Sequence, residues 1–287
     1  MRTQGIIKIA ILLAADFAII YGLFNIWAAG GVLGAMLLYA WLGEFIALRK
    51  DRAVGIEYVD ERSRAKLNKA MDLLKEEVKA RFSEDVPEMK LHVLQTDEIN
   101  ACSYGAGNIA VTRGTLKVAD ILTLKAILAH ELSHSLCLDA VFHRIVFANV
   151  TAILLGITVT SLFATSFIWL VFLILCLMGM CGSFLSVYCT SGIAKFTRGF
   201  FRGLQKLVLV IYQTLMGLVS RASEYRADRY SCRLGYGVQL KYFLRTYVLP
   251  QDGQKRTLTE IIYASHPDTC KRLEKIERNE RQEISAA

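Results

Sequence analysis

The chain has 287 residues, of which 54% are hydrophobic and 21% charged, and 34 basic against 26 acidic side chains give it a formal net charge of +8. An average soluble domain holds about 45–50% apolar residues, and the excess here is concentrated in positions 145–194, where no Asp, Glu, Lys, Arg or His occurs. Such a run excludes a fully soluble protein, and three prolines without biased tracts exclude a disordered chain.

Two apolar segments, residues 6–24 and 26–48, begin the chain, and each is long enough to cross a hydrocarbon core of about 30 Å as a helix. Because basic residues are retained on the cytosolic side of a membrane, the flanking charges predict a transmembrane hairpin over 1–48 with both ends in the cytosol. The flanking charges are Arg2 and Lys8 before the first segment, and Arg49, Lys50 and Arg52 after the second.

Two features of this hairpin leave alternatives open. Asp16, in the middle of the first span, is either a functional ionisable group or a carboxyl that is protonated or hydrogen-bonded to a neighbouring helix, and we favour the second. The Gly30-x-x-x-Gly34 spacing permits close helix contact, which we expect between the two hairpins of the chain rather than between two copies of it.

The polar segment that follows predicts a mixture of helix and strand. Apolar residues at helical spacing predict an amphipathic helix over 60–82, and short apolar runs predict strands over 91–94 and 108–111. Asp120 has the form of an N-cap for a helix that runs through Leu138.

The uncharged run divides near residues 164–166 into two predicted spans, roughly 145–163 and 167–190. Arg144 stands before it and Lys195 after it, which predicts a second hairpin with the same orientation as the first. The polar segments on either side of this hairpin therefore share the cytosol.

A basic stripe follows the second hairpin at steps of three, four and four residues, which places its side chains on one side of a helix. Aromatic and aliphatic residues stand between them, so we expect a helix at the membrane surface; the alternative is the solvated face of an ordinary packed helix. The stripe consists of Lys195, Arg198, Arg202 and Lys206. Further on, Thr257 and Glu260 form a capping-box pattern, and Pro267 suits the first position of a final charged helix.

Together these segments predict an α+β, mostly helical protein with a small β-sheet and four transmembrane helices in two hairpins. The predicted parts are an N-terminal transmembrane hairpin (1–48), a first cytosolic part (49–144), a second transmembrane hairpin (145–194) and a second cytosolic part (195–287). Any chemistry is expected from the two cytosolic parts.

The most informative motif is His130-Glu131-Leu132-Ser133-His134. Residues four apart share one face of a helix, so both imidazoles can bind one metal ion while Glu131 reaches its water. On its own the motif is also compatible with a helix that merely exposes two histidines and a glutamate.

A second pair of residues at helical spacing supplies a candidate third ligand, which the histidine motif lacks. Glu224 and Asp228 are again four residues apart, and alone they would also suit a charged helix with salt bridges to neighbouring arginines. Together with the histidine motif they predict one zinc ion bound by His130, His134 and Glu224. Asp228 then accepts a hydrogen bond from the second ring nitrogen of His130.

Three protein ligands leave one position of a tetrahedral zinc ion for water, which makes the predicted site catalytic rather than structural. Zinc lowers the pKa of that water toward about 7, and Glu131 acts as general base and then carries the proton to the leaving amine. Attack of the resulting hydroxide on a polarised peptide carbonyl is the chemistry of a metallopeptidase.

The order of these motifs resembles the membrane zinc endopeptidases of the HtpX type, in the family that also contains the CAAX prenyl proteases. The resemblance covers most of the chain: a hairpin, the histidine helix, a second hairpin and then the acidic pair. It implies a gluzincin-like zinc peptidase core in which His130, His134 and Glu224 bind zinc and Glu131 is catalytic. Asp139 matches a position at which the family has an aspartate near the metal.

Two further segments match family motifs. Asn100, Ala101 and Cys102 resemble the family's Asn-Ala-Phe, an edge strand that pairs with substrate backbone, although Cys in place of Phe changes the local pocket. His266 and Arg272 resemble its His-Pro…Arg, which implies that His266 donates to the oxyanion and that Arg272 contacts substrate. The alternative for His266 is a histidine that only begins a helix.

The resemblance also implies the substrates, which are misfolded or membrane proteins cut on the cytoplasmic side of a bacterial inner membrane as quality control. The basic flanks imply contact with anionic lipid headgroups and account for much of the net charge, so nucleic acid is not an expected partner. A prenyl-protein protease is an alternative disfavoured by the short chain. A non-catalytic adaptor whose zinc only joins the two cytosolic parts is disfavoured by Glu131. Oligomeric state is not predicted.

Overall fold

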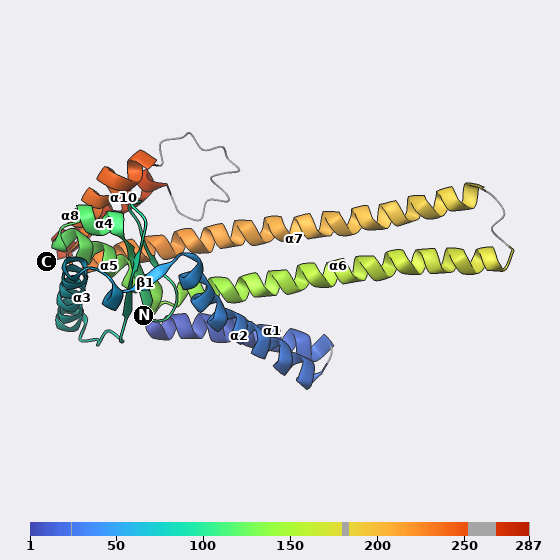
Figure 1. The fold of residues 1–287 in the computed structure, drawn as a ribbon, viewed down its shortest axis with the longest axis horizontal. Helices are drawn as coiled ribbons and strands as arrows, with labels where there is room; N and C mark the ends of the chain where they lie inside the picture. The colour runs from blue at the N-terminus through green and yellow to red at the C-terminus, as the bar shows by residue number, and fades with distance from the viewer. Residues whose placement is uncertain (24, 180–183, 252–267, 287) are drawn as a thin grey trace. The chain divides into compact units, whose positions relative to one another are not determined.

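Helices make up most of the structure, which confirms the mostly helical α+β class predicted from the sequence (Figure 1). The computed structural model describes residues 1–23, 25–179, 184–251 and 268–286. The chain forms two compact units, one of Met1–Ile145 with Gly217–Ala287 and the other of Val146–Met216.

A four-stranded sheet lies in the first unit, in the order β1-β2-β4-β3. The central strands β2 (Lys90–Leu94) and β4 (Asn108–Thr112) run parallel and agree with the two predicted strands. The outer strands β1 (Ala53–Gly55) and β3 (Ala101–Ser103) pair antiparallel to them. At three residues each, they are too short to show an alternating pattern in the sequence, and only the family resemblance indicated β3.

The helix that carries the histidine motif is α5 (Ile121–Leu136), and it is buried along almost its whole length. Asp120 caps it, since its Oδ1 accepts a hydrogen bond from the N–H of Thr123 at 2.7 Å. The helix ends two residues before the predicted end, because Leu138 has a left-handed backbone with a φ of 56°. A new helix, α6, begins directly after this turn at Asp139.

Helix α3 (Glu61–Phe82) confirms the predicted amphipathic helix and packs along α5. Its apolar face includes Leu67 and Leu74, which are fully buried in one core with Leu124 and Leu128 of α5. Each such leucine contributes about 1.5–3 kcal/mol to folding. The remaining short elements are η1 (Ile56–Tyr58), α4 (Arg113–Val118), α8 (Gly237–Phe243), η2 (Leu244–Val248) and η3 (Leu249–Gln251).

The C-terminal helix is α10 (Thr269–Ala286), which packs against α8. The side chain of Asp268 accepts a hydrogen bond from the N–H of Cys270 at 2.8 Å and so caps the helix. The capping box at Thr257 and Glu260, and Pro267, lie outside the described residues.

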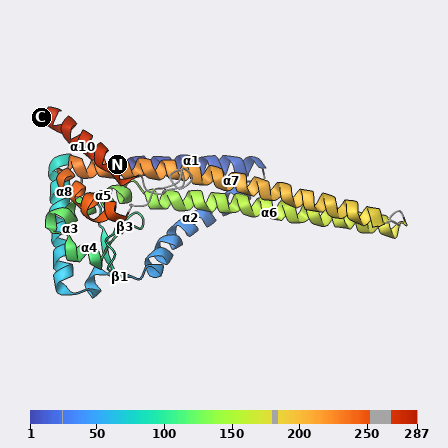
Figure 2. The same ribbon diagram turned by 90° about the horizontal axis from the view of Figure 1, so that it is seen from above.

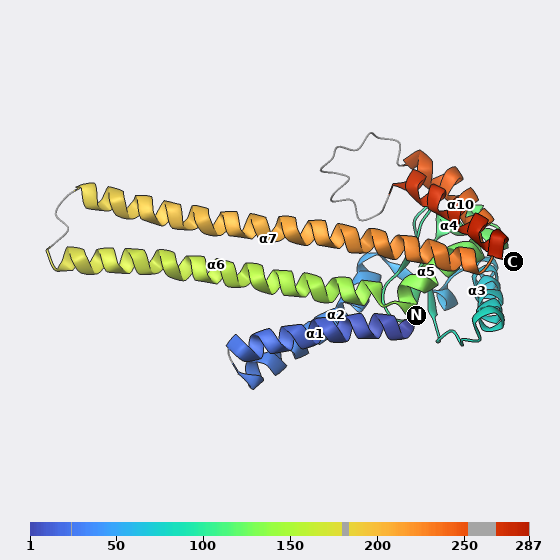
Figure 3. The same cartoon turned by 180° about the vertical axis from the view of Figure 1, so that it is seen from behind.

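The N-terminal hairpin consists of α1 (Arg2–Leu23) and α2 (Ile26–Lys50), which lie side by side (Figure 3). Asn25 caps α2 by accepting a hydrogen bond from the N–H of Ala28 at 2.9 Å. Both helices are long and apolar enough to cross a membrane, and most of their large apolar side chains are exposed, as they would be toward lipid.

The second unit consists of parts of two long antiparallel helices, α6 (Asp139–Leu177) and α7 (Phe184–Arg233), which run side by side in Figures 1 and 2. Nε2 of Gln205 donates to Oγ1 of Thr158 at 2.8 Å, and the rings of Phe147 and Tyr212 are 6.4 Å apart. Both helices also satisfy the length and hydropathy of a membrane span.

The predicted break at residues 164–166 is wrong, because α6 passes through these positions without interruption. Ala, Thr and Ser are tolerated inside helices, and only Gly and Pro interrupt them reliably. The helix ends instead before Gly179, whose φ of 72° is the left-handed conformation that terminates helices. The basic stripe from Lys195 to Lys206 is helical, as predicted, and lies within the longer helix α7.

Candidate metal centre and active site

Two imidazoles meet because α5 carries them one turn apart on the same face. The rings of His130 and His134 have centroids 4.9 Å apart, and their Nε2 atoms are 3.2 Å apart. Both side chains are largely shielded from solvent, at 9% and 14% exposed. Two ring nitrogens at this separation need a proton or a metal ion between them.

The third group comes from the C-terminal part of α7. Oε2 of Glu224 lies 3.4 Å from Nε2 of His130, and its Oε1 lies 3.8 Å from Nε2 of His134. One candidate ligand atom from each of these three residues lies within 4.8 Å of the others. The fold thus brings together two residues of α5 and one residue far along the chain.

The separations fit a tetrahedral metal ion. Atoms that bind zinc at about 2.0–2.1 Å stand about 3.3–3.4 Å from one another in a tetrahedron, and the observed distances are 3.2, 3.4 and 3.8 Å. Two imidazoles and one carboxylate are also the donor set of catalytic zinc sites, which keep a fourth position for water or substrate. The residues present could therefore hold one such ion.

Each imidazole has a carboxylate on its other nitrogen. Nδ1 of His130 lies 3.0 Å from Oδ1 of Asp228, and Nδ1 of His134 lies 2.9 Å from Oδ2 of Asp139. An ionised carboxylate only accepts hydrogen bonds, so each ring holds a proton on Nδ1 and turns Nε2 toward the metal position.

Arg272, near the start of α10, binds the acidic residues of α7. Its Nε and Nη2 donate to the two carboxylate oxygens of Asp228 at 2.9 and 2.7 Å, and its Nη1 lies 3.1 Å from Oε2 of Glu224. Burial lowers the pKa of the guanidinium, but the charges of Asp228 and Glu224 outweigh burial and raise this pKa above its ordinary value. The structure thus places Arg272 against the candidate metal centre itself.

The electrostatics of His130 set a condition on metal binding. Burial disfavours its charged form, yet hydrogen bonds and charges from Asp228 and Glu224 outweigh burial and raise the pKa of the metal-free imidazole to about 10. A metal ion needs the neutral ring, so it must displace a proton when it binds.

The profile of peptidase family M48 matches residues 64–280, which is well over half of the chain. The chain belongs to peptidase family M48. Metallopeptidases of this family are zinc-dependent in general, and the assignment confirms the resemblance that the ordered motifs indicated. The part of the chain that the structure describes also holds four helices that are long and apolar enough to cross a membrane.

Among solved structures, the crystal structure of Ste24p from S. mikatae is similar to this chain. The TM-score is 0.52 and the sequence identity 19%, over 94% of this chain and 62% of Ste24p. This chain therefore spans less than two thirds of the length of that protein, and the likeness shows a shared fold alone. No curated protein sequence matches.

In this member of family M48, Glu131 follows the first histidine on α5 and is buried, with 8% of its surface exposed. Its negative charge helps to raise the pKa of the Cys102 thiol on β3 and that of Arg272 on α10. The Glu131 carboxylate therefore lies close enough to Cys102 and to Arg272 to interact with both electrostatically.

Strand β3 is an edge strand of the sheet and packs against α5. The backbone of Asn100 and that of Tyr104 bond to β4, so by the two-residue period the backbone groups of Ala101 and Ser103 point to the outer edge. Oδ1 of Asn100 accepts a hydrogen bond from the N–H of Ala101 at 2.9 Å and so covers one of these edge donors. This edge offers backbone groups with which an extended chain can pair.

The side chain of Cys102 turns toward a small apolar cluster with Leu94, Tyr104 and Ala110. Burial is the main cause that raises the pKa of its thiol to about 11. A protonated, largely covered thiol is a small apolar side chain in this position.

His266, which the family resemblance marks as an oxyanion donor, lies outside the described residues. Sequence reasoning missed two residues that the structure adds to the centre, Lys8 and Arg226, both of which donate to Asp139. No periodic pattern could have paired Lys8 with a residue 131 positions away.

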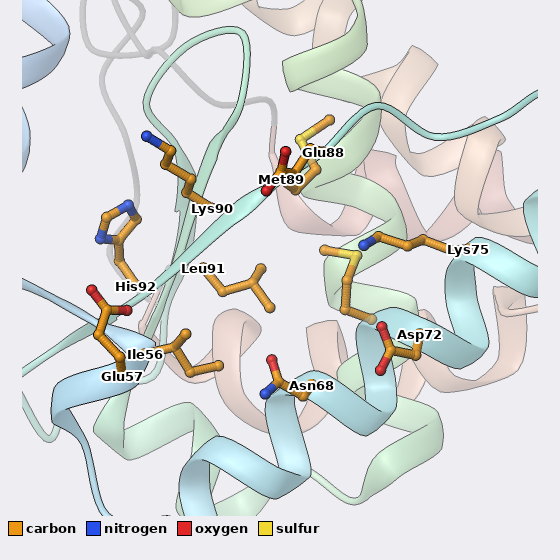
Figure 4. Close-up of a pocket in the computed structure, with 11 residues that line it drawn as sticks. Ile56, Glu57, Asn68, Asp72, Lys75, Glu88, Met89, Lys90, Leu91 and His92 are labelled. Carbon is orange, nitrogen blue, oxygen red and sulfur yellow. The ribbon is translucent and has the colours of Figure 1, made fainter.

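A separate pocket of about 390 Å³ lies between β2 and α3 (Figure 4). The pocket has a mixed charge, from Glu57, Asp72, Lys75 and Lys90. His92 also lines it, and Nε2 of His92 lies 2.7 Å from Oδ1 of Asn108. None of the described metal-site residues lines it, so we assign it no part in catalysis.

Proposed function

We propose that this chain is a zinc endopeptidase of the bacterial inner membrane that cuts misfolded or membrane proteins on the cytoplasmic side as quality control. The observation that carries the proposal is the convergence of Nε2 of His130, Nε2 of His134 and the Glu224 carboxylate within 4.8 Å, with Glu131 next to the first ligand.

Zinc held by these three residues would polarise the scissile carbonyl and lower the pKa of a water at the fourth position. Asp228 and Asp139 hold the two imidazoles with Nε2 toward that ion. A site that only joined two parts of the chain would have no use for a buried carboxylate beside the first ligand, which argues against a non-catalytic adaptor.

Glu131 is the proposed general base. It accepts a proton from the attacking water and delivers it to the leaving amine. His266 is the proposed donor to the oxyanion of the tetrahedral intermediate, on the family resemblance alone.

The substrate backbone is proposed to add as a further strand to the outer edge of β3, next to Asn100, Ala101 and Cys102. Main-chain pairing recognises any extended polypeptide, which suits a protease with loosely folded substrates. Arg272, whose donors are engaged by Asp228 and Glu224, is proposed to act on substrate only through these carboxylates.

Basic residues flank both apolar hairpins, which supports an active site in the cytosol near anionic headgroups. The same topology would also suit a prenyl-protein protease. Cleavage of casein without cleavage of a farnesylated peptide supports the broad substrate class, and the reverse result replaces it by the prenyl-protein alternative.

The test of the mechanism is a matched preparation in detergent of the unaltered chain, E131Q, and E76Q as a control at an exposed glutamate of α3. We expect about one zinc per chain in all three, and chelator-sensitive cleavage of casein in the unaltered chain and E76Q. General base catalysis accelerates a reaction about 10²–10⁴-fold, so the cleavage rate of E131Q should fall by at least about 10²-fold. Full cleavage by zinc-loaded E131Q would refute the assignment.

A further inference from the structure

Asp139 is the meeting point of three donors from three helices. Its Oδ2 accepts from Nδ1 of His134 at 2.9 Å and from Nη2 of Arg226, and its Oδ1 accepts from Nζ of Lys8 at 2.6 Å. The Asp139 side chain is 7% exposed and that of Lys8 30% exposed. The link through Lys8 joins the first helix of the N-terminal hairpin to a metal-binding histidine.

The backbone of α1 comes unusually close to the end of α5 at this point. A Cβ placed on Gly5 would lie 2.5 Å from the carbonyl oxygen of Cys137, so only glycine permits this approach. Lys8 stands three residues further on the same side of α1, and its ammonium also lies 5.1 Å from the ring centre of Phe142. The helix is thus docked where its one lysine reaches Asp139.

We propose that Lys8 is a positioning residue for the metal ligand His134, so that the N-terminal hairpin forms part of the metal centre. The inference rests on the proposed function in taking the metal to be zinc. By holding Oδ1, Lys8 orients the Asp139 carboxylate so that Oδ2 meets the imidazole. Without Lys8, the planar fork of Arg226 can take both oxygens and turn the carboxylate away from His134.

The experiment compares zinc affinity, by competition with a chelator, in full-length detergent-solubilised protein and its variants K8M, K8R and K50M. Lys50 is an exposed lysine at the end of α2 and serves as the matched control. Residues that orient metal ligands typically change metal affinity by about 10–100-fold. We expect the zinc affinity of K8M to be at least about tenfold lower than that of the unaltered chain. The affinity of K8R should lie within about threefold of the unaltered chain, and that of K50M should be unchanged.

Absorption of the Co²⁺-loaded protein supplies a readout that altered folding alone would not shift. We expect a changed ligand-field spectrum in K8M and an unchanged spectrum in K50M. Zinc affinity in K8M within about twofold of the unaltered chain overturns this inference alone. Failure of the unaltered chain to cleave protein while it binds zinc overturns the proposed function and leaves the role of Lys8 standing. Failure of the unaltered chain to bind zinc overturns both.

Discussion

Arg272 holds Asp228 with two parallel hydrogen bonds, at 2.9 and 2.7 Å, on a carboxylate whose Oδ1 also faces Nδ1 of His130 at 3.0 Å. The arginine therefore stabilises, in a buried setting, the carboxylate that contacts the proposed metal ligand His130. Removal of one partner of a buried pair costs about 3–5 kcal/mol, because the other charge remains without compensation.

R272M should therefore lower both the thermal stability and the zinc affinity of the protein, the latter by about 10–100-fold. R272K should be intermediate, because an ammonium cannot form the two-pronged contact. R245M is the control, since Arg245 is 58% exposed in its pair with Glu277 and such surface pairs contribute about 0–1 kcal/mol. Thermal unfolding in detergent and chelator competition measure both effects; equal losses in R272M and R245M would contradict the assignment.

G5V should weaken the docking of α1, because its side chain would clash with the backbone carbonyl of Cys137. Overpacking of this kind costs about 1–3 kcal/mol. The matched control is G31V, since a Cβ at Gly31 would meet no described atom within 4 Å other than the adjoining backbone of its own helix. We expect a lower melting temperature and weaker zinc retention in G5V only; an unaltered G5V would mean that α1 moves without effect on the metal centre.

Zinc uptake should release protons at neutral pH. The pKa of metal-free His130 is raised to about 10, so this imidazole is charged at pH 7 and must lose its proton to bind metal. Apparent affinity should consequently rise with pH, by up to about tenfold per unit from this group below its pKa. Calorimetric titration with zinc in two buffers of different ionisation enthalpy measures the proton count. A count of zero at pH 7 would show that the ring is neutral before binding.

Cys102 should resist alkylation at pH 8. With its pKa raised from 9.0 to about 11, only about one thiol in a thousand is ionised at pH 8, against about one in ten at the unshifted value. The rate of labelling by iodoacetamide should then rise about tenfold per pH unit up to pH 10. Peptide mapping by mass spectrometry compares it with the exposed Cys270; equal rates at pH 8 would contradict the raised pKa of the partly buried Cys102.

The extent of each helix shows where local sequence signals suffice. The helix after Asp120 and the amphipathic helix over 60–82 could be predicted because their caps and apolar spacing are local. The division of the apolar run at 164–166 failed, since small polar residues resemble a turn but remain helical inside a long apolar helix. Helix α6 ends before Gly179, whose left-handed backbone conformation is seen only in the structure.

By itself, the sequence determined the family, the membrane helices and the set of residues from which a metal centre could be built. The membrane helices depend on the length of apolar runs, and the family on the order of motifs along the chain. The candidate ligands depend on spacing within one helix, such as the four-residue steps from His130 to His134 and from Glu224 to Asp228. Only the tertiary structure decided which groups surround these residues: Arg272 on Asp228, and Lys8 on Asp139. Such contacts join side chains from helices far apart in the chain, and the packing of backbones that brings them within hydrogen-bond distance leaves no periodic trace in the sequence.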